Sequence, residues 1–168
     1  CGNVWAAGAP ALGVAANAYL EQMRELAETL LSIGEVPLAQ PPGFFTDMTQ
    51  HSTYPMNVNW YPPASVTGEP EPGQFRIGPH TDFGTFTILD REPGKGGLQI
   101  WSPDAATLGV ASLDEGWEAA PSHPDAFTIH TGDLLARWSG DRWPSYRPRV
   151  LPPPVEAPTA LLVSMVSF

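Results

Sequence analysis

The sequence predicts a mainly β protein with one long N-terminal helix, built as a sandwich or jelly roll. Twenty prolines and 16 glycines among 168 residues disfavour long helices and favour short strands joined by turns. Six Trp, seven Phe and four Tyr provide large core side chains, which disfavours a chain that is disordered throughout. By length, we expect residues 1–168 to form a single domain.

The helical pattern lies over residues 17–33. Apolar side chains recur there at helical spacing, with one stripe formed by Tyr19, Met23, Leu26 and Leu30. Glu and Arg side chains fall mostly on the opposite face. We therefore expect an amphipathic helix that packs on a β core formed by residues 55–168.

After residue 54 the chain breaks into short apolar or alternating runs. We expect strands over 56–61, 75–77, 80–89, 98–101, 117–120, 126–130 and 161–168. Residues 134–138 form either a strand or a single helical turn. A turn over 92–97, an irregular segment over 102–116 and a proline break over 152–154 separate the runs. Short strands at this regular spacing are typical of sandwiches and jelly rolls.

Residues 56–61 alternate in character. Met56, Val58 and Trp60 would share one face, and Asn57, Asn59 and Tyr61 would share the other. A strand with one face of amide and phenol groups indicates a polar cavity. A half-solvated strand at a sheet edge explains the same alternation equally well.

The strongest chemical signal is His80-Thr81-Asp82. In a strand, residues two apart point to the same side, so the imidazole of His80 and the carboxylate of Asp82 would face one way. These are two of the three ligands in the facial triad that holds non-haem Fe(II). Alone, each has an ordinary explanation, as a core histidine or a turn carboxylate. Together they favour a metal site.

Composition disfavours several other classes of protein. The net charge is −10 with no basic patch, which disfavours nucleic-acid binding. No apolar run approaches the length of a membrane span, and no signal peptide is visible. The single cysteine, Cys1, excludes an intramolecular disulfide and fits a reducing compartment. We therefore expect a cytoplasmic protein whose partner is a small-molecule substrate, without nucleic acid or membrane.

Five motifs follow one another along the second part of the chain: Asn59-Trp60-Tyr61-Pro62-Pro63, His80-Thr81-Asp82, Gly96-Gly97-Leu98-Gln99-Ile100, His130-Thr131-Gly132-Asp133-Leu134 and Ser164 to Phe168. In this order and spacing they resemble the core of the Fe(II)/2-oxoglutarate-dependent dioxygenases of the isopenicillin N synthase-like group. The resemblance covers residues 57–168 and corresponds to the C-terminal catalytic barrel part of that group.

The resemblance implies a double-stranded β-helix, or jelly roll, that binds Fe(II) and 2-oxoglutarate and hydroxylates or otherwise oxidises a small organic molecule. It implies that His80 and Asp82 are metal ligands and that Tyr61 and Ser164 contact the oxoacid. Three aromatic residues are candidates for the pocket wall, although core packing is the commoner role for each: Trp60, Phe83 and Trp138.

The chain departs from the family pattern at two positions. Pro148 stands where the family has its second histidine, and Leu162 where it has the arginine that binds the oxoacid carboxylate. Proline has no atom that can bind a metal, and leucine cannot make the bidentate contact that arginine makes with a carboxylate. Using Arg147 or Arg149 instead would need a rearranged strand.

Three other histidines remain. We expect His51 and His123 to be exposed, and we do not expect His130 to be the third ligand. The sequence therefore leaves two hypotheses. The protein is an active oxygenase, or it is a catalytically impaired relative that keeps the jelly roll as a binding or interaction module.

Overall fold

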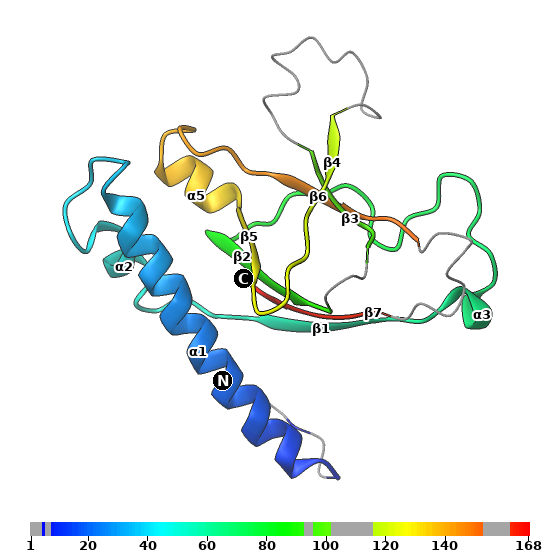
Figure 1. Cartoon of the computed structure of the whole chain (residues 1–168). Helices are drawn as coiled ribbons and strands as arrows, with labels where there is room; N and C mark the ends of the chain where they lie inside the picture. Colours follow the sequence, from blue (N-terminus) through cyan, green and yellow to red (C-terminus); the bar gives the residue numbers. More distant parts are fainter. Residues whose placement is uncertain (1–4, 6–7, 93–95, 102–115, 153–161) are drawn as a thin grey trace. The chain divides into compact units, whose positions relative to one another are not determined.

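The computed structural model describes residues 5, 8–92, 96–101, 116–152 and 162–168 (Figure 1). The chain forms two compact units, one of residues 1–56 with Ser167 and the other of residues 57–166 with Phe168. Cys1, the predicted segment 102–116, the turn 92–97 and the break 152–154 lie wholly or partly outside the described residues. Packing of the N-terminal helix on the β core stays a prediction.

The first unit contains two helices, α1 (Pro10–Glu35) and α2 (Phe44–Thr49). The predicted helix over 17–33 is confirmed, but its start was placed too late. Proline fits the first turn of a helix because its missing N–H would have no partner there, so α1 begins at Pro10. The side chains of Met23, Ala27 and Leu31 are buried at a spacing of one helical turn.

The carboxylate of Glu35 joins the end of α1 to the start of α2. Its two oxygens accept hydrogen bonds from the backbone N–H groups of Gly43, at 3.0 Å, and Phe45, at 3.1 Å. The first N–H groups of a helix have no partner within the helix, and a negative charge is favourable beside them. Glu35 is only 4% exposed and Phe45 is fully buried, so this contact lies inside the first unit.

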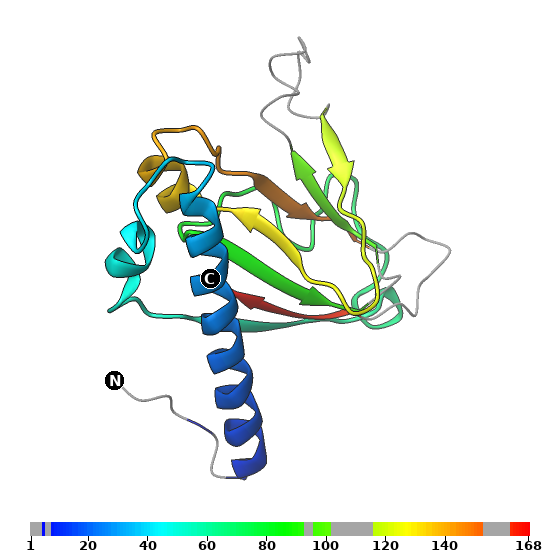
Figure 2. The ribbon, with the colours of Figure 1, turned by 60° about the vertical axis from the view of Figure 1, so that its left-hand side comes forward.

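The second unit contains two β-sheets (Figures 1 and 2). The four-stranded sheet has the order β1 (Met56–Tyr61), β7 (Leu162–Ser167), β2 (Phe86–Arg91), β5 (Thr128–Thr131). The three-stranded sheet has the order β4 (Trp117–Ala119), β3 (Leu98–Trp101), β6 (Arg147–Val150). The described part of this unit also contains two short helices, α3 (Ala64–Thr67) and α5 (Asp133–Trp138). The prediction of a mainly β chain with one long N-terminal helix is confirmed.

Apolar side chains from both sheets form a core cluster in the second unit. Leu89 of β2, Leu98 of β3 and Val150 of β6 are buried together, and Val166 of β7 packs against them. In the register of the strands, Thr87 lies opposite His130 and Ile100 lies opposite Pro148. The pairing therefore sets the positions of His130 and Pro148.

In the described part of the second unit, one predicted strand is absent and another begins later than predicted, and residues 134–138 adopt one of their two predicted structures. Residues 75–77 contribute only an isolated bridge between Ile77 and Val150. Residues 80–85 form an irregular segment, and β2 begins only at Phe86. Residues 134–138 lie in a helix, α5. In the described part of the chain, no helix is long and apolar enough to cross a membrane.

The irregular segment binds the turn before α5 by its backbone. Gly132 N–H donates to Thr85 O, and Asp133 N–H donates to Asp82 O, both at 2.8 Å. These bonds replace the ladder that a strand would have formed. A Cβ atom on Gly132 would lie 2.8 Å from Asp82 O, which is closer than real Cβ contacts. Glycine is therefore required here by the close approach of two backbones.

We expect Glu35→Ala to lower the free energy of unfolding by about 1–3 kcal/mol, because the buried N–H of Phe45 and the partly buried N–H of Gly43 lose their acceptor. Urea denaturation followed by circular dichroism measures the change. Glu25→Ala, on an exposed position of α1, is the matched control and should stay within about 0.5 kcal/mol of wild type. Equal effects of the two substitutions would contradict the proposed link between α1 and α2.

We expect Gly132→Ala to destabilise the protein by about 1–3 kcal/mol, because the new methyl group must push Asp82 and Gly84 away from the turn. Gly96→Ala is the control, since a Cβ atom at Gly96 meets no atom within 4 Å. Thermal unfolding of both variants makes the comparison. A Gly132→Ala protein as stable as wild type would show that the two segments can separate at little cost.

Candidate metal and cofactor site

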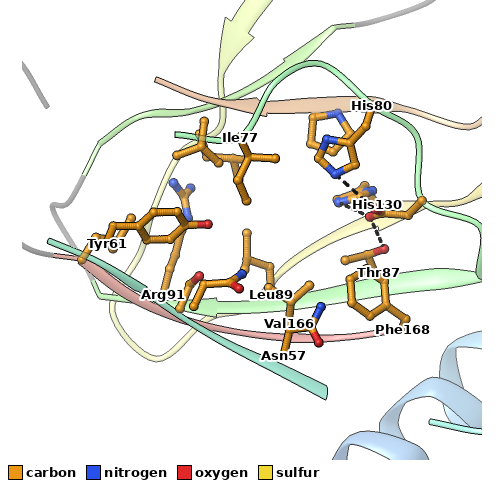
Figure 3. A pocket seen from close by; sticks show the side chains of 17 residues that line it. Asn57, Tyr61, Ile77, His80, Thr87, Leu89, Arg91, His130, Val166 and Phe168 are labelled. Atoms are coloured by element: carbon orange, nitrogen blue, oxygen red, sulfur yellow. Dashed lines mark hydrogen bonds and ion pairs between the residues drawn. The ribbon is translucent and has the colours of Figure 1, made fainter. Parts of the chain in front are cut away.

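A cavity of about 180 Å³ lies between the two sheets of the second unit (Figure 3). Its wall includes side chains from β1, β2, β5, β6 and β7 and from the segment before β2. All four residues predicted to form the site line it: Tyr61, His80, Asp82 and Ser164. Asn57 and Asn59 line it as well, which confirms that the polar face of β1 faces a cavity.

His80 and Asp82 converge on this cavity. The Nε2 atom of His80 lies 3.4 Å from Oδ1 of Asp82. The Nδ1 atom lies 2.9 Å from the carbonyl oxygen of Gly78, which can only accept a hydrogen bond. A proton on Nδ1 would satisfy the Gly78 carbonyl and would leave Nε2, which lies beside the carboxylate, able to bind a metal. Metal-binding histidines commonly donate their second N–H to a carbonyl in this way.

His80 and Asp82 converge as predicted, but the predicted cause, the alternation of side chains along a strand, is wrong. They do not lie in a strand, so the alternation of a strand does not align them. Instead, His80 N–H donates to Pro148 O at 3.2 Å, and Asp133 N–H donates to Asp82 O. Contacts with two distant parts of the chain hold the irregular segment on both sides.

The carboxylate of Asp82 is buried and has three polar neighbours. Thr87 donates its hydroxyl to Oδ2 at 2.5 Å, and Nε2 of His130 lies 3.4 Å from the same oxygen. Burial raises the pKa of Asp82, but the bonds with His80 and Thr87 and the two nearby imidazoles outweigh it. The pKa of Asp82 is therefore below its usual value, and the group is an anion at neutral pH.

His130 lies closer to the site than the sequence indicated. It is buried in β5, opposite Thr87, and it lines the cavity. Burial lowers the pKa of His130, although the charge of Asp82 opposes this effect. The pKa of His80 is raised, and the main cause is its hydrogen bond with Asp82. The predicted exposure of His51 and His123 is confirmed. The alternation along residues 86–91 was the available signal, since it directs Thr87 inward and the pairing then brings His130 beside it.

The two residues predicted to depart from the family pattern both lie at the cavity. Pro148 is buried in β6 and Leu162 is buried in β7, and each lines the wall. Among the described residues, no group of three or more His, Cys, Asp or Glu side chains is arranged to hold a metal ion. The donors that fit a metal are therefore His80 and Asp82, with His130 on the far side of the carboxylate.

Tyr61 and Ser164 lie together on the wall. Burial raises the pKa of Tyr61, and its hydrogen bonds with Ser164 and Asn59 oppose this effect. Both residues therefore present neutral hydroxyl groups to the cavity. Arg149 lies elsewhere, because its Nε donates to Gln99 at 2.7 Å and its guanidinium stacks on the Trp117 ring, 4.0 Å from the centroid.

The three aromatic candidates do not line the cavity. Trp60 is 63% exposed because it alternates with the inward-facing Asn59 and Tyr61. Phe83 is 87% exposed, next to the inward-facing Asp82. Trp138 lies in α5, the helical one of the two structures predicted for that segment. Neighbours of cavity residues along an extended chain point away from the cavity.

Curated proteins similar to this chain include dioxygenases. Validamycin A dioxygenase from Streptomyces hygroscopicus subsp. limoneus is 40% identical over 166 residues, which are 99% of this chain and 43% of that protein. The 2-oxoglutarate-dependent dioxygenase thnC from Trichoderma harzianum is 32% identical over 137 residues, which are 79% of this chain and 38% of that protein. The chain thus spans less than half the length of these relatives.

Solved structures show the same fold. A full-length Neurospora crassa protein, crystallised in complex with alpha-KG, aligns with a TM-score of 0.82 and 26% identity. The alignment covers 100% of this chain and 50% of that one. The family model described as the 2OG-Fe(II) oxygenase superfamily matches residues 47–168. Because this match includes both sheets and the whole cavity wall, the chain belongs to the 2OG-Fe(II) oxygenase superfamily.

Proposed function

We propose that this chain is the C-terminal catalytic part of an oxidoreductase that uses Fe(II) and 2-oxoglutarate to hydroxylate or otherwise oxidise a small organic molecule. The observation that supports this most strongly is the convergence of His80 and Asp82 on one cavity. The resemblance to dioxygenases along nearly the whole chain adds to it. The two antiparallel sheets with a cavity between them are consistent with a double-stranded β-helix, the jelly roll expected from the family.

In this proposal His80 and Asp82 are the metal ligands, and Tyr61 and Ser164 contact the oxoacid. When bound, Fe(II) would activate dioxygen, the oxidant, and 2-oxoglutarate would supply two electrons as it is oxidised to succinate and CO2. The chain's own residues orient the ligands. Gly78 O sets the tautomer of His80, and the Thr87 hydroxyl fixes one oxygen of Asp82. His130 gives the buried carboxylate a further polar neighbour on its other side.

The net charge and the cysteine content support the proposed partner and location. A net charge of −10 supports a small-molecule substrate over nucleic acid. A single cysteine supports a cytoplasmic location, because the reducing cytoplasm needs no disulfides. We also propose that residues 1–168 act as one domain.

A second function is favoured by the two substitutions at the cavity. Pro148 offers no ligand atom and Leu162 no hydrogen bond, so a metal held by His80 and Asp82 alone would be bound weakly. The protein would then be a catalytically impaired relative that keeps the fold as a binding or interaction module. The two functions differ in whether the chain turns over 2-oxoglutarate.

Anaerobic titration of the protein with Fe(II) and 2-oxoglutarate tests the first function. We expect a charge-transfer absorption band from the complex, and we expect His80→Ala to abolish it, because one of two ligands is lost. His123→Ala is the control, since His123 is exposed and does not line the cavity. A band absent at saturating oxoacid would contradict catalysis, and succinate release would contradict the impaired relative.

A histidine at position 148 should strengthen metal binding. Pro148 lines the cavity and its carbonyl accepts the N–H of His80, so Pro148→His adds an imidazole beside the two ligands. We expect the Kd for Fe(II) or Co(II) to fall by roughly tenfold or more, about 1.4 kcal/mol per factor of ten. Pro124→His, at an exposed turn, should leave the Kd unchanged. Equal Kd values for both variants would show that position 148 does not face the metal.

A further inference from the structure

We propose that Arg91 binds a carboxylate of the oxoacid and so replaces the arginine that β7 lacks at position 162. This inference rests on the proposed function and assigns a residue to it. Arg91 is the last residue of β2, is only 8% exposed and lines the cavity. Figure 3 shows its side chain beside Tyr61, at the end of the cavity away from His80.

The guanidinium of Arg91 is held in place by hydrogen bonds at one nitrogen and keeps an N–H donor that is not used. Its Nη2 atom donates to the carbonyl oxygens of Ala120 and Pro121, each at 2.6 Å. Its Nε atom is buried and has no hydrogen-bond partner among the described residues. The two carbonyl groups fix the orientation of the guanidinium without neutralising its charge. The N–H at Nε is therefore available to a ligand that enters the cavity.

No carboxylate compensates the charge of Arg91 in the part of the chain that the structure describes. Arg91 takes part in none of its ion pairs. The carboxylate on the cavity wall, Asp82, is engaged by Thr87, His80 and His130. Burying a cation without a counter-ion is unfavourable, and arginine does not lose its proton to become neutral. An anionic ligand would remove the penalty.

Arg91 also lies where the missing arginine would have acted. β7 is the neighbour of β2, and the two run antiparallel, because Gly84 lies against Phe168 and Val163 N–H contacts Glu92 Oε2 at 3.4 Å. The end of β2 therefore lies beside the start of β7, which begins at Leu162. Moving a guanidinium from one strand to its neighbour leaves the charge at the same end of the cavity.

The spacing along β2 supports a ligand that spans the two ends. Thr87, Leu89 and Arg91 all line the cavity, as the alternation of a strand requires. Four residues of strand extend about 13 Å, so Thr87, at the Asp82 end, is well separated from Arg91. The metal with its ligands, the oxoacid and the long arginine side chain would share that span. Tyr61 and Ser164 would add hydroxyl donors near Arg91.

Two other arginines near the cavity are engaged elsewhere. Arg76 donates to Pro62 O at 3.1 Å and lies over the Tyr61 ring, 5.4 Å from its centroid. Arg149 bonds Gln99 and stacks on Trp117. Neither guanidinium lines the cavity, whereas Arg91 does.

Calorimetric titration of metal-free protein with glutarate tests this role without requiring turnover. Glutarate carries the two carboxylates of 2-oxoglutarate but lacks the keto group. We expect Arg91→Met to weaken glutarate binding by roughly 10- to 100-fold, the range for losing a charged hydrogen bond. Arg147→Met, at an exposed position of β6, should bind like wild type. Equal affinities for wild type and Arg91→Met, or no binding to wild type, would overturn the proposal.

Two further variants guard against a folding defect, because Arg91→Met also loses the bonds to Ala120 and Pro121. Arg91→Lys keeps the charge and should retain measurable glutarate binding. The double variant Arg91→Met/Leu162→Arg should recover affinity relative to Arg91→Met, since the guanidinium returns to the neighbouring strand. Folded Arg91→Lys protein without glutarate binding, or a double variant that recovers none, would count against the assignment.

Two more measurements separate this inference from the proposed function. 2-Oxoglutarate should displace glutarate, and simultaneous binding of both would show that Arg91 serves a different anion and overturn the proposal. Succinate release from 2-oxoglutarate in the presence of Fe(II) and dioxygen is measured on the same protein, because it requires the metal ligands whereas glutarate binding to metal-free protein does not. If Arg91-dependent glutarate binding is found without Fe(II)-dependent oxidation, the carboxylate site stands and the oxygenase function fails.

Discussion

The buried carboxylate of Asp82 is the group around which the second unit is arranged. Its backbone carbonyl accepts the N–H of Asp133, its Oδ2 atom accepts the hydroxyl of Thr87, and the imidazoles of His80 and His130 lie on either side. A buried anion is tolerated only when such partners surround it. These contacts bring β2, β5 and the segment before β2 to one point, and Gly132 permits their close approach.

The cavity has opposite charges at its two ends. Asp82 is negative and already compensated by its neighbours, whereas Arg91 is positive and lacks a counter-ion among the described residues. Apolar side chains such as Leu89 and Val150 line the wall as well, which keeps water from screening either charge. A small dianion that binds a metal through one end and an arginine through the other would suit this distribution. In our proposal, Arg91 on β2 supplies the guanidinium that is missing at Leu162. For Pro148 the described residues offer no third metal ligand in its place.

Local patterns predicted many of the elements correctly. The helical stripe located α1, and alternation in 56–61 correctly directed Asn57, Asn59 and Tyr61 toward a cavity. Errors arose where distant segments replace a local pattern. The pattern of residues 80–85 predicts a strand, but the turn before α5 binds their backbone. The proximity of His130 to Asp82 depends on the pairing of β2 with β5, which neither strand specifies alone.

The sequence by itself determined the chemistry available at the site. It contains a histidine and an aspartate two residues apart, hydroxyl groups at Tyr61 and Ser164, and Pro148 and Leu162 where the resemblance implies a histidine and an arginine. Only the tertiary structure decided which further groups join them. His130 and Thr87 reach Asp82, and Arg91 reaches the cavity beside Tyr61, through the pairing of strands far apart in the chain. The physical reason is that burial and charge compensation depend on all the packed neighbours of a group, whereas periodicity reports only on its own strand.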